Sequence, residues 1–197
     1  KLKKSLVAVK DAGCEYALLQ PNSSDYHDWK AVMENYVCAK LLWNPYRDVN
    51  ALRNEFIDYY YGAAADDVRY VTFTLEEHIS NLIQNVDKRF YVSPLDSIHL
   101  PAGMFEGCLD RLQSAKDKIN KTSLTDTEKE ELLGRIDEVR LTPLFYLMWN
   151  RERYYLDDAE RYNNVAKDFF ETSAAVGAVY YGEHRTIASL KNIYPYS

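Results

Sequence analysis

Apolar residues recur at three- and four-residue intervals from Asp25 to Ala175, and this spacing constrains the fold more than any other feature. Such intervals place apolar side chains on one face of an α-helix. The stretches that keep this period are residues 25–43, 48–61, 63–90, 102–120, 125–142 and 158–175. We expect a mainly α protein, an antiparallel bundle of about six helices joined by short turns. Pro143 should kink or break the helix that it interrupts.

The stretch LLWNPYRDVNALRNEFIDYYYG, residues 41–62, predicts the best-defined joint between two of these helices. Proline lacks a backbone donor and pushes the residue before it out of the helical region, so the first helix should end near Trp43. Asp48 predicts the N-cap of the next helix, and Gly62 can take positive φ just past its end. The residues of this structural joint are Trp43, Asn44, Pro45, Asp48, Phe56 and Gly62.

Residues 14–20, CEYALLQ, are the one stretch that predicts a strand, and PNSS follows it as a loop. A lone strand leaves its backbone donors and acceptors unpaired. We therefore expect this strand to belong to a sheet in a longer parent protein, since KLKKSLVAVKDAG at the start already looks like the interior of a domain. In the isolated chain its edge should pair with a second copy, giving a homodimer, or be covered by the C-terminal tail.

The charge pattern argues against nucleic acid as a partner. The net charge is −6 and no Lys/Arg cluster exceeds KLKK at the start, whereas proteins that bind the phosphate backbone need a basic surface. No apolar run approaches the roughly 20 residues that cross a bilayer, so we predict no membrane span. The three cysteines, Cys14, Cys38 and Cys108, are widely spaced and should be small buried hydrophobic residues rather than disulfide partners or zinc ligands.

No set of residues in this sequence predicts a self-sufficient active site. The acidic pairs are Asp66–Asp67, Glu76–Glu77, Glu130–Glu131 and Asp157–Asp158, and the histidines are His27, His78, His99 and His184. A glycosidase needs two carboxylates roughly 5 to 9.5 Å apart across a bond. Sequence neighbours on a helix point about 100° apart, and the histidines lack ligand spacing. We predict no catalytic residue, no metal site and no cofactor.

Seventeen tyrosines against seven phenylalanines distinguish the composition. Tyrosine has a large apolar face and a hydroxyl group, which suits both half-buried helix seams and surfaces that stack on sugars. Most of these tyrosines fall at helical spacing, which favours the seams and leaves sugar stacking as the second interpretation.

Three stretches between residues 12 and 65 carry a resemblance to a known family: AGCEYALLQ, YVCAKLLWNP and DVNALRNEFIDYYYGAAA. This region resembles the end of the catalytic barrel, with the helices after it, in a family of uncharacterised bacterial proteins grouped with the glycoside hydrolases. These proteins are distantly similar to α-glucuronidases and β-N-acetylhexosaminidases. Residues 66–197 resemble the family only in their helical character.

The resemblance implies that residues 14–20 are the short last strand left over from a (β/α)8 barrel. Residues 1–24 would be the remnant of the last barrel βα unit, and residues 25–197 the helical C-terminal domain. Active sites of such barrels lie at the carboxyl ends of the strands, so Gln20 and Asn22 are the implied substrate-binding residues. The catalytic carboxylates would come from earlier strands, and the parent protein would be secreted or periplasmic.

Two functions therefore stand as hypotheses. The first is the non-catalytic helical C-terminal portion of a carbohydrate-active enzyme, with the remainder of the barrel as its partner and carbohydrate as the ligand of the parent. The alternative is a free-standing helical module that binds a glycan or a protein through tyrosine and tryptophan surfaces. Aromatic residues buried in helix seams would favour the first, and an exposed aromatic patch of several hundred Å² would favour the second.

Overall fold

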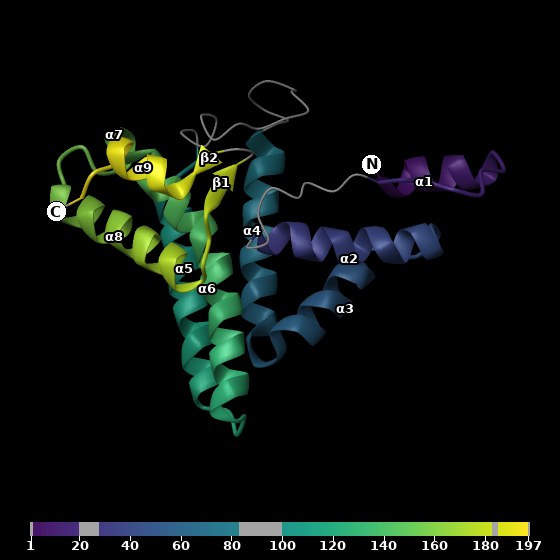
Figure 1. The fold of residues 1–197 in the computed structure, drawn as a ribbon, viewed down its shortest axis with the longest axis horizontal. Coiled ribbons are helices and arrows are strands. Elements are labelled where there is room, and N and C mark those ends of the chain that lie inside the picture. The colour runs from purple at the N-terminus through teal and green to yellow at the C-terminus, as the bar shows by residue number, and fades with distance from the viewer. Residues whose placement is uncertain (1, 20–27, 83–99, 183–184, 197) are drawn as a thin grey trace.

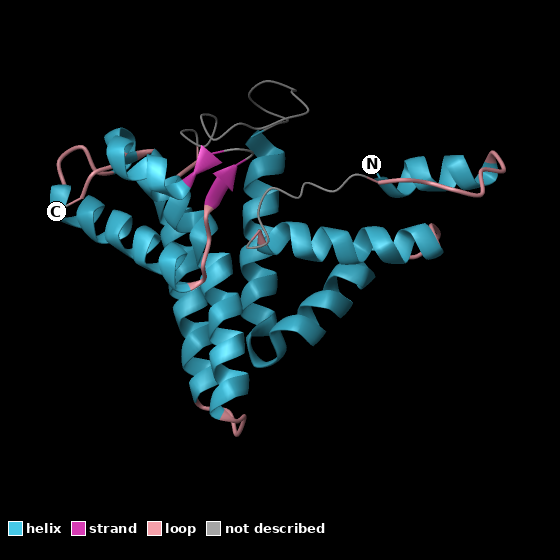
Figure 2. Ribbon diagram, in the orientation of Figure 1, coloured by secondary structure: helices cyan, strands magenta, loops and turns pink. Residues whose placement is uncertain are grey.

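The computed structural model describes residues 2–19, 28–82, 100–182 and 185–196 (Figure 1). The protein is mainly helical, as the periodicity predicts, and has one small antiparallel sheet near the C-terminus (Figure 2). The helices are α1 (Leu2–Asp11), α2 (Trp29–Trp43), α3 (Val49–Tyr61), the 3-10 helix η1 (Gly62–Ala64), α4 (Ala65–Leu82), α5 (Ala102–Asn120), α6 (Asp126–Trp149), α7 (Arg151–Tyr154), α8 (Ala159–Ala175) and α9 (Ile187–Ile193). The strands are β1 (Tyr180–Gly182) and β2 (Arg185–Thr186). Within the described ranges, no helix has both the length and the apolar character needed to cross a membrane.

The centre of the molecule is formed by α4, α5 and α6, which stand side by side in Figure 1, with α8 packed across α6. Their facing sides share one large core, because each helix presents its apolar stripe to the others. Fully buried members of this core include Phe105, Leu112, Ile136, Leu147 and Phe169. The helices α2 and α3 leave this centre as an arm, and α1 lies beside the outer part of α2.

The arm has a small core of its own, formed by Leu6, Val37, Leu41 and Leu52. These four side chains come from α1, α2 and α3. Leu6 is the single buried residue that α1 contributes. Because α1 has so little buried apolar surface, it is held far less firmly than the central helices.

The joint between α2 and α3 follows from local chemistry. After α2 ends at Trp43, Asn44 has an extended backbone and Pro45 begins the turn. The Asp48 carboxylate then accepts a 2.7 Å hydrogen bond from the Ala51 amide, which caps α3. Gly62 has φ 50°, a value that residues with a Cβ rarely adopt, and this allows the chain to turn from α3 into η1 and α4.

Two features differ from the sequence prediction. Residues 14–19 lie in a loop beside α1 rather than in a strand, because among the described residues no other segment pairs with them; residue 20 is outside the described ranges. The described part of the tail does not cover them, since residues 14–18 are exposed and β1 and β2 pair with each other. Of the two outcomes expected at Pro143, a kink or a break, the break is wrong, because α6 continues through this residue. Pro143 is itself buried next to Leu144, so packing against the core compensates for the hydrogen bond that proline cannot donate.

Candidate functional site

A groove of about 300 Å³ lies between α1, residues 14–17 and the end of α2, and we refer to it as the α1–α2 groove. Leu6 and Leu41 form its apolar base, where the small core of the arm reaches the surface. Its rim carries Lys10, Tyr16 and Trp43. A concave, mostly apolar surface with a few polar groups is the usual form of a binding site.

Large apolar side chains around this groove are fully in water. Tyr16 is 90% exposed, Leu18 95% and Trp43 93%. Trp43 is exposed because it is the last residue of α2, and the Asn44-Pro45 turn that ends the helix leaves nothing beyond it to pack on. Exposed apolar groups of this size that gather at one place mark an interaction surface.

The backbone beside the groove is also unpaired. The amide of Cys14 donates to the carbonyl of Val9 at 3.2 Å and thereby ends the turn after α1. From residue 15 to residue 19, no backbone group bonds to any other described residue. Residues 14–18 are exposed and Leu19 is half-buried. This segment therefore has a row of donors and acceptors that no other described residue satisfies, next to exposed apolar side chains.

A hydrogen bond fixes the position of the α2–α3 turn relative to α1. The Tyr46 hydroxyl donates to the Asp11 carboxylate at 2.6 Å, and this bond raises the pKa of Tyr46. The Tyr46 amide donates to the Asn44 side chain at 3.0 Å, which closes the turn. The turn that follows α2 is thus bonded to the end of α1, and these two elements border the groove.

A polar cluster around Glu55 holds the same turn against α2 and α3. The Glu55 carboxylate accepts from the Tyr36 hydroxyl and from Arg47, the latter at 2.7 Å, and Lys40 lies 3.7 Å away. The hydrogen bonds from Tyr36 and Arg47 lower the pKa of Glu55. These groups satisfy each other, which favours a structural role for the cluster.

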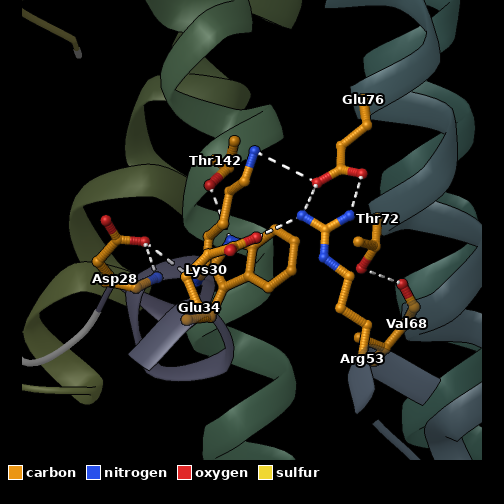
Figure 3. A network of polar contacts seen from close by, with 10 residues as sticks. Asp28, Lys30, Glu34, Arg53, Val68, Thr72, Glu76 and Thr142 are labelled. Carbon is orange, nitrogen blue, oxygen red and sulfur yellow. Dashed lines mark hydrogen bonds and ion pairs between the residues drawn. The ribbon is translucent and has the colours of Figure 1, made fainter. Parts of the chain in front are cut away.

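A second polar network connects the arm to the central helices (Figure 3). Arg53 of α3 donates two 3.0 Å hydrogen bonds to Glu76 of α4 and another to Glu34 of α2. Lys30 adds an ion pair of 3.5 Å to Glu76. The indole N–H of Trp29 donates to the Thr142 hydroxyl of α6 at 3.1 Å. The network thereby positions the α1–α2 groove relative to the bundle.

Two open depressions, of about 390 and 380 Å³, flank Gly134 on α6 and share Glu130 and the end of α8. Carboxylates border both. Asp137, which lines the first, is already paired with Lys116 and Arg140. Lys129 in the first and Arg135 in the second stand among these carboxylates. Neither depression is lined by large exposed apolar side chains like Tyr16 and Trp43, so the α1–α2 groove is the stronger candidate.

The structure places the predicted residues unevenly. Gln20 and Asn22 lie outside the described residues. Trp43 and Pro45 line the groove, whereas Phe56 is buried. In the parts of the chain that the structure describes, no group of three or more His, Cys, Asp or Glu could hold a metal ion.

Comparison with known proteins finds a family model that matches the first part of the chain. Residues 1–72 match the family model of a domain of unknown function (DUF4838). No curated protein and no solved structure matches the chain. The matched residues begin with α1 and end inside α4, so they contain the whole α1–α2 groove. The candidate site therefore lies in the part of the chain that matches this family model.

Proposed function

We propose that this chain is the non-catalytic helical C-terminal portion of a carbohydrate-active enzyme of the glycoside hydrolase type, and that it supports the catalytic barrel. In this proposal residues 1–24 complete the barrel and residues 25–197 form the helical domain. The resemblance over residues 12–65 supplies the class of parent protein. The match to DUF4838 covers the same region but gives no function, so the class of the parent rests on the resemblance alone.

The observation that carries the proposal is the order of α1, residues 14–19 and α2. A βα barrel alternates helices and strands, and each strand is flanked by other strands and covered by helices. Residues 14–19 lie between two helices in sequence, beside α1 in space, and expose the side chains of Tyr16 and Leu18. A barrel strand without its neighbours would have this appearance.

The aromatic residues support the same proposal, because many of them pack between helices. Tyr61, Tyr155, Tyr162 and Tyr194 are buried. Phe105 of α5 stacks on Tyr146 of α6 with ring centroids 5.4 Å apart. Their energetic contribution is therefore to the helical fold, as expected of a supporting domain.

The test compares the full-length gene product with residues 1–197 alone, using a panel of 4-nitrophenyl glycosides that includes glucuronides and N-acetylhexosaminides. We expect hydrolysis by the full-length product and none by the isolated chain. Arg53→Met in the full-length product should lower the temperature at which activity is lost while kcat at 25 °C is kept, since Arg53 supports the fold without touching substrate. Full-length protein without glycosidase activity, or an isolated chain that is equally active, would refute the proposal.

One observation favours the alternative, a free-standing binding module. Trp43 and Tyr16 present exposed aromatic faces at a groove, which suits a sugar ring. Trp29 is buried and Trp149 half-buried, so a saturable change in tryptophan emission on adding cellohexaose or chitohexaose would report on Trp43. If Trp43→Ala abolishes that change and Tyr59→Ala does not, the binding module is the better description.

A further inference from the structure

We propose that the α1–α2 groove and residues 15–19 form a docking surface for one extended polypeptide strand of the parent protein, with Trp43 as the apolar anchor of the interface. This inference rests on the proposed function and specifies its partner. The partner strand would lie beside residues 15–19, and its apolar side chains would cover the groove and the indole of Trp43.

The backbone determines the kind of partner. Residues 15–19 present successive amides and carbonyls that bond to nothing else in the described structure. Donors and acceptors that repeat at the spacing of a polypeptide are best matched by another extended polypeptide, as when a peptide adds to an exposed sheet edge. A sugar ring has no such repeat. The unpaired backbone therefore favours an extended strand over a glycan at this surface.

The side chains determine the chemistry of that strand. In an extended segment alternate residues point to the same side, which puts Tyr16 and Leu18 together. Both are almost fully exposed, and Trp43 stands across the groove from this segment. Lys10 and Glu15 are the charged groups among the residues that line the groove, and they have opposite signs. The surface is thus apolar with no net charge, and it fits a strand with apolar side chains.

Trp43 is the residue most suited to anchor the contact. Tryptophan and tyrosine dominate the binding energy of protein interfaces, because they bury a large area with few rotatable bonds. The hydrogen bond between Tyr46 and Asp11 holds the turn that follows Trp43, so the backbone that carries the indole already lies at the groove. A backbone that is already in place has less conformational entropy to lose on binding.

The experiment measures amide hydrogen exchange at residues 15–19 and hydroxyl-radical oxidation of Trp43, in the isolated chain and in the full-length product. Docking predicts exchange at least about tenfold slower in the full-length product, since protection reports hydrogen bonding and burial. Oxidation of Trp43 should fall in parallel. Tyr59, which is 90% exposed on α3, is the internal control and should be oxidised equally in both.

Two full-length variants, each with a matched control, separate the contribution of the backbone from that of the side chains. Ala17→Pro removes one amide donor and should restore rapid exchange at the neighbouring amides, whereas Ala17→Ser keeps the donor and should not. Trp43→Ala should weaken the protection, and Tyr59→Ala should leave it unchanged. In the isolated chain, Ala17→Pro should leave the melting temperature unchanged, because the Ala17 amide has no partner among the described residues.

Equal amide exchange at residues 15–19 in both proteins would overturn the inference. Protection that appears only as the full-length product dimerises with rising concentration would also overturn it, because a second copy would then occupy the surface. The result is independent of glycosidase activity. Slow exchange at residues 15–19 without glycosidase activity would support the docking surface and refute the proposed function. Glycosidase activity with equally rapid exchange in both proteins would support the proposed function and refute the docking surface.

Discussion

Asp67, which has no exposed surface, forms an ion pair with Lys118 across the contact between α4 and α5, with 2.7 Å between Oδ2 and Nζ. Its other oxygen lies 2.7 Å from Nε of Arg111. Asp67 also stands in the first turn of α4, where the helix dipole favours a negative charge. A buried carboxylate with two cationic partners thus fixes the register of two central helices.

Asp67→Asn should destabilise the protein by about 1–3 kcal/mol, because a buried group loses its charged partners. The cost should stay below that of a wholly buried pair, since Lys118 and Arg111 are partly exposed and can turn to water. Urea unfolding measures the change. Asp66→Asn is the matched control: that side chain is 83% exposed and should change stability by less than about 0.5 kcal/mol. Equal effects of the two substitutions would contradict this account.

Arg53→Met should cost about 1–3 kcal/mol, because it leaves Glu34 and Glu76 without the cation between them. A double-mutant cycle with Glu76→Gln should give a coupling energy of about 0.5 kcal/mol or more. A coupling near zero would mean that Arg53 acts through packing of its aliphatic stem alone. Lys167→Met, which removes an exposed i,i+4 pair with Glu171, provides the low-effect comparison.

Acid should weaken the protein through two exposed carboxylates. The Thr125 side chain and amide donate to Glu128, which lowers the pKa of Glu128 in the folded state, and Tyr36 and Arg47 lower that of Glu55. A lowered folded pKa means stabilisation that is complete above the unfolded value, about 4.3, and is lost as the pH falls through the folded value. Unfolding measured between pH 6 and pH 3 should show this loss. It should be smaller in Thr125→Ala and Tyr36→Phe, and an unchanged pH profile in both variants would contradict the assignment.

The cysteines should differ in reactivity. Cys108 is buried, and burial raises the pKa of its thiol to about 11, whereas Cys14 is exposed. The thiolate is the reactive form, so iodoacetamide at pH 8 should modify Cys14 first and spare Cys108 until the protein is unfolded. Mass spectrometry of peptides from the native and the urea-treated protein measures both rates. Modification of Cys108 in the native protein at the rate of Cys14 would show that α5 opens readily.

Self-association provides a further test of the uncovered surface. In the isolated chain no described residue covers residues 15–18 or Trp43, so we expect concentration-dependent dimers. Leu18→Lys should abolish them in analytical ultracentrifugation, because a charge on an exposed edge opposes pairing. Tyr59→Lys changes an equally exposed residue on α3 and should leave them intact. A monomer at every concentration would remove the expectation of a homodimer through this edge.

Local signals in the sequence predict the helices well. The capping box of Thr125 and Glu128 is present at the start of α6, and the Asp48 cap marks the start of α3. Each of these depends on residues within one turn, which sequence spacing contains. The expectation of three buried cysteines holds for Cys108 and is wrong for Cys14, because burial depends on what packs there rather than on apolar neighbours in sequence.

Contacts between distant residues escape such analysis. Asp66 and Asp67 look alike in sequence, yet one is exposed and the other is buried against α5, whose cations lie far along the chain. The exposure of Trp43 cannot be predicted from the sequence either. Helical spacing predicts which residues share a face, but it does not predict whether another element covers that face. The β1–β2 pair also escapes prediction from the sequence, because its strands are too short to show a period.

The match to DUF4838 ends at residue 72, within α4, and at that point the chain is in the middle of its main core. Val68, Val71 and Leu75 lie on both sides of the boundary and pack into the same cluster. The segment that matches the family model and the unit that folds are therefore different lengths of one polypeptide. A gene cut at the family boundary would leave half a helix with its apolar stripe in water, so excision and fusion of this region should follow the ends of helices instead.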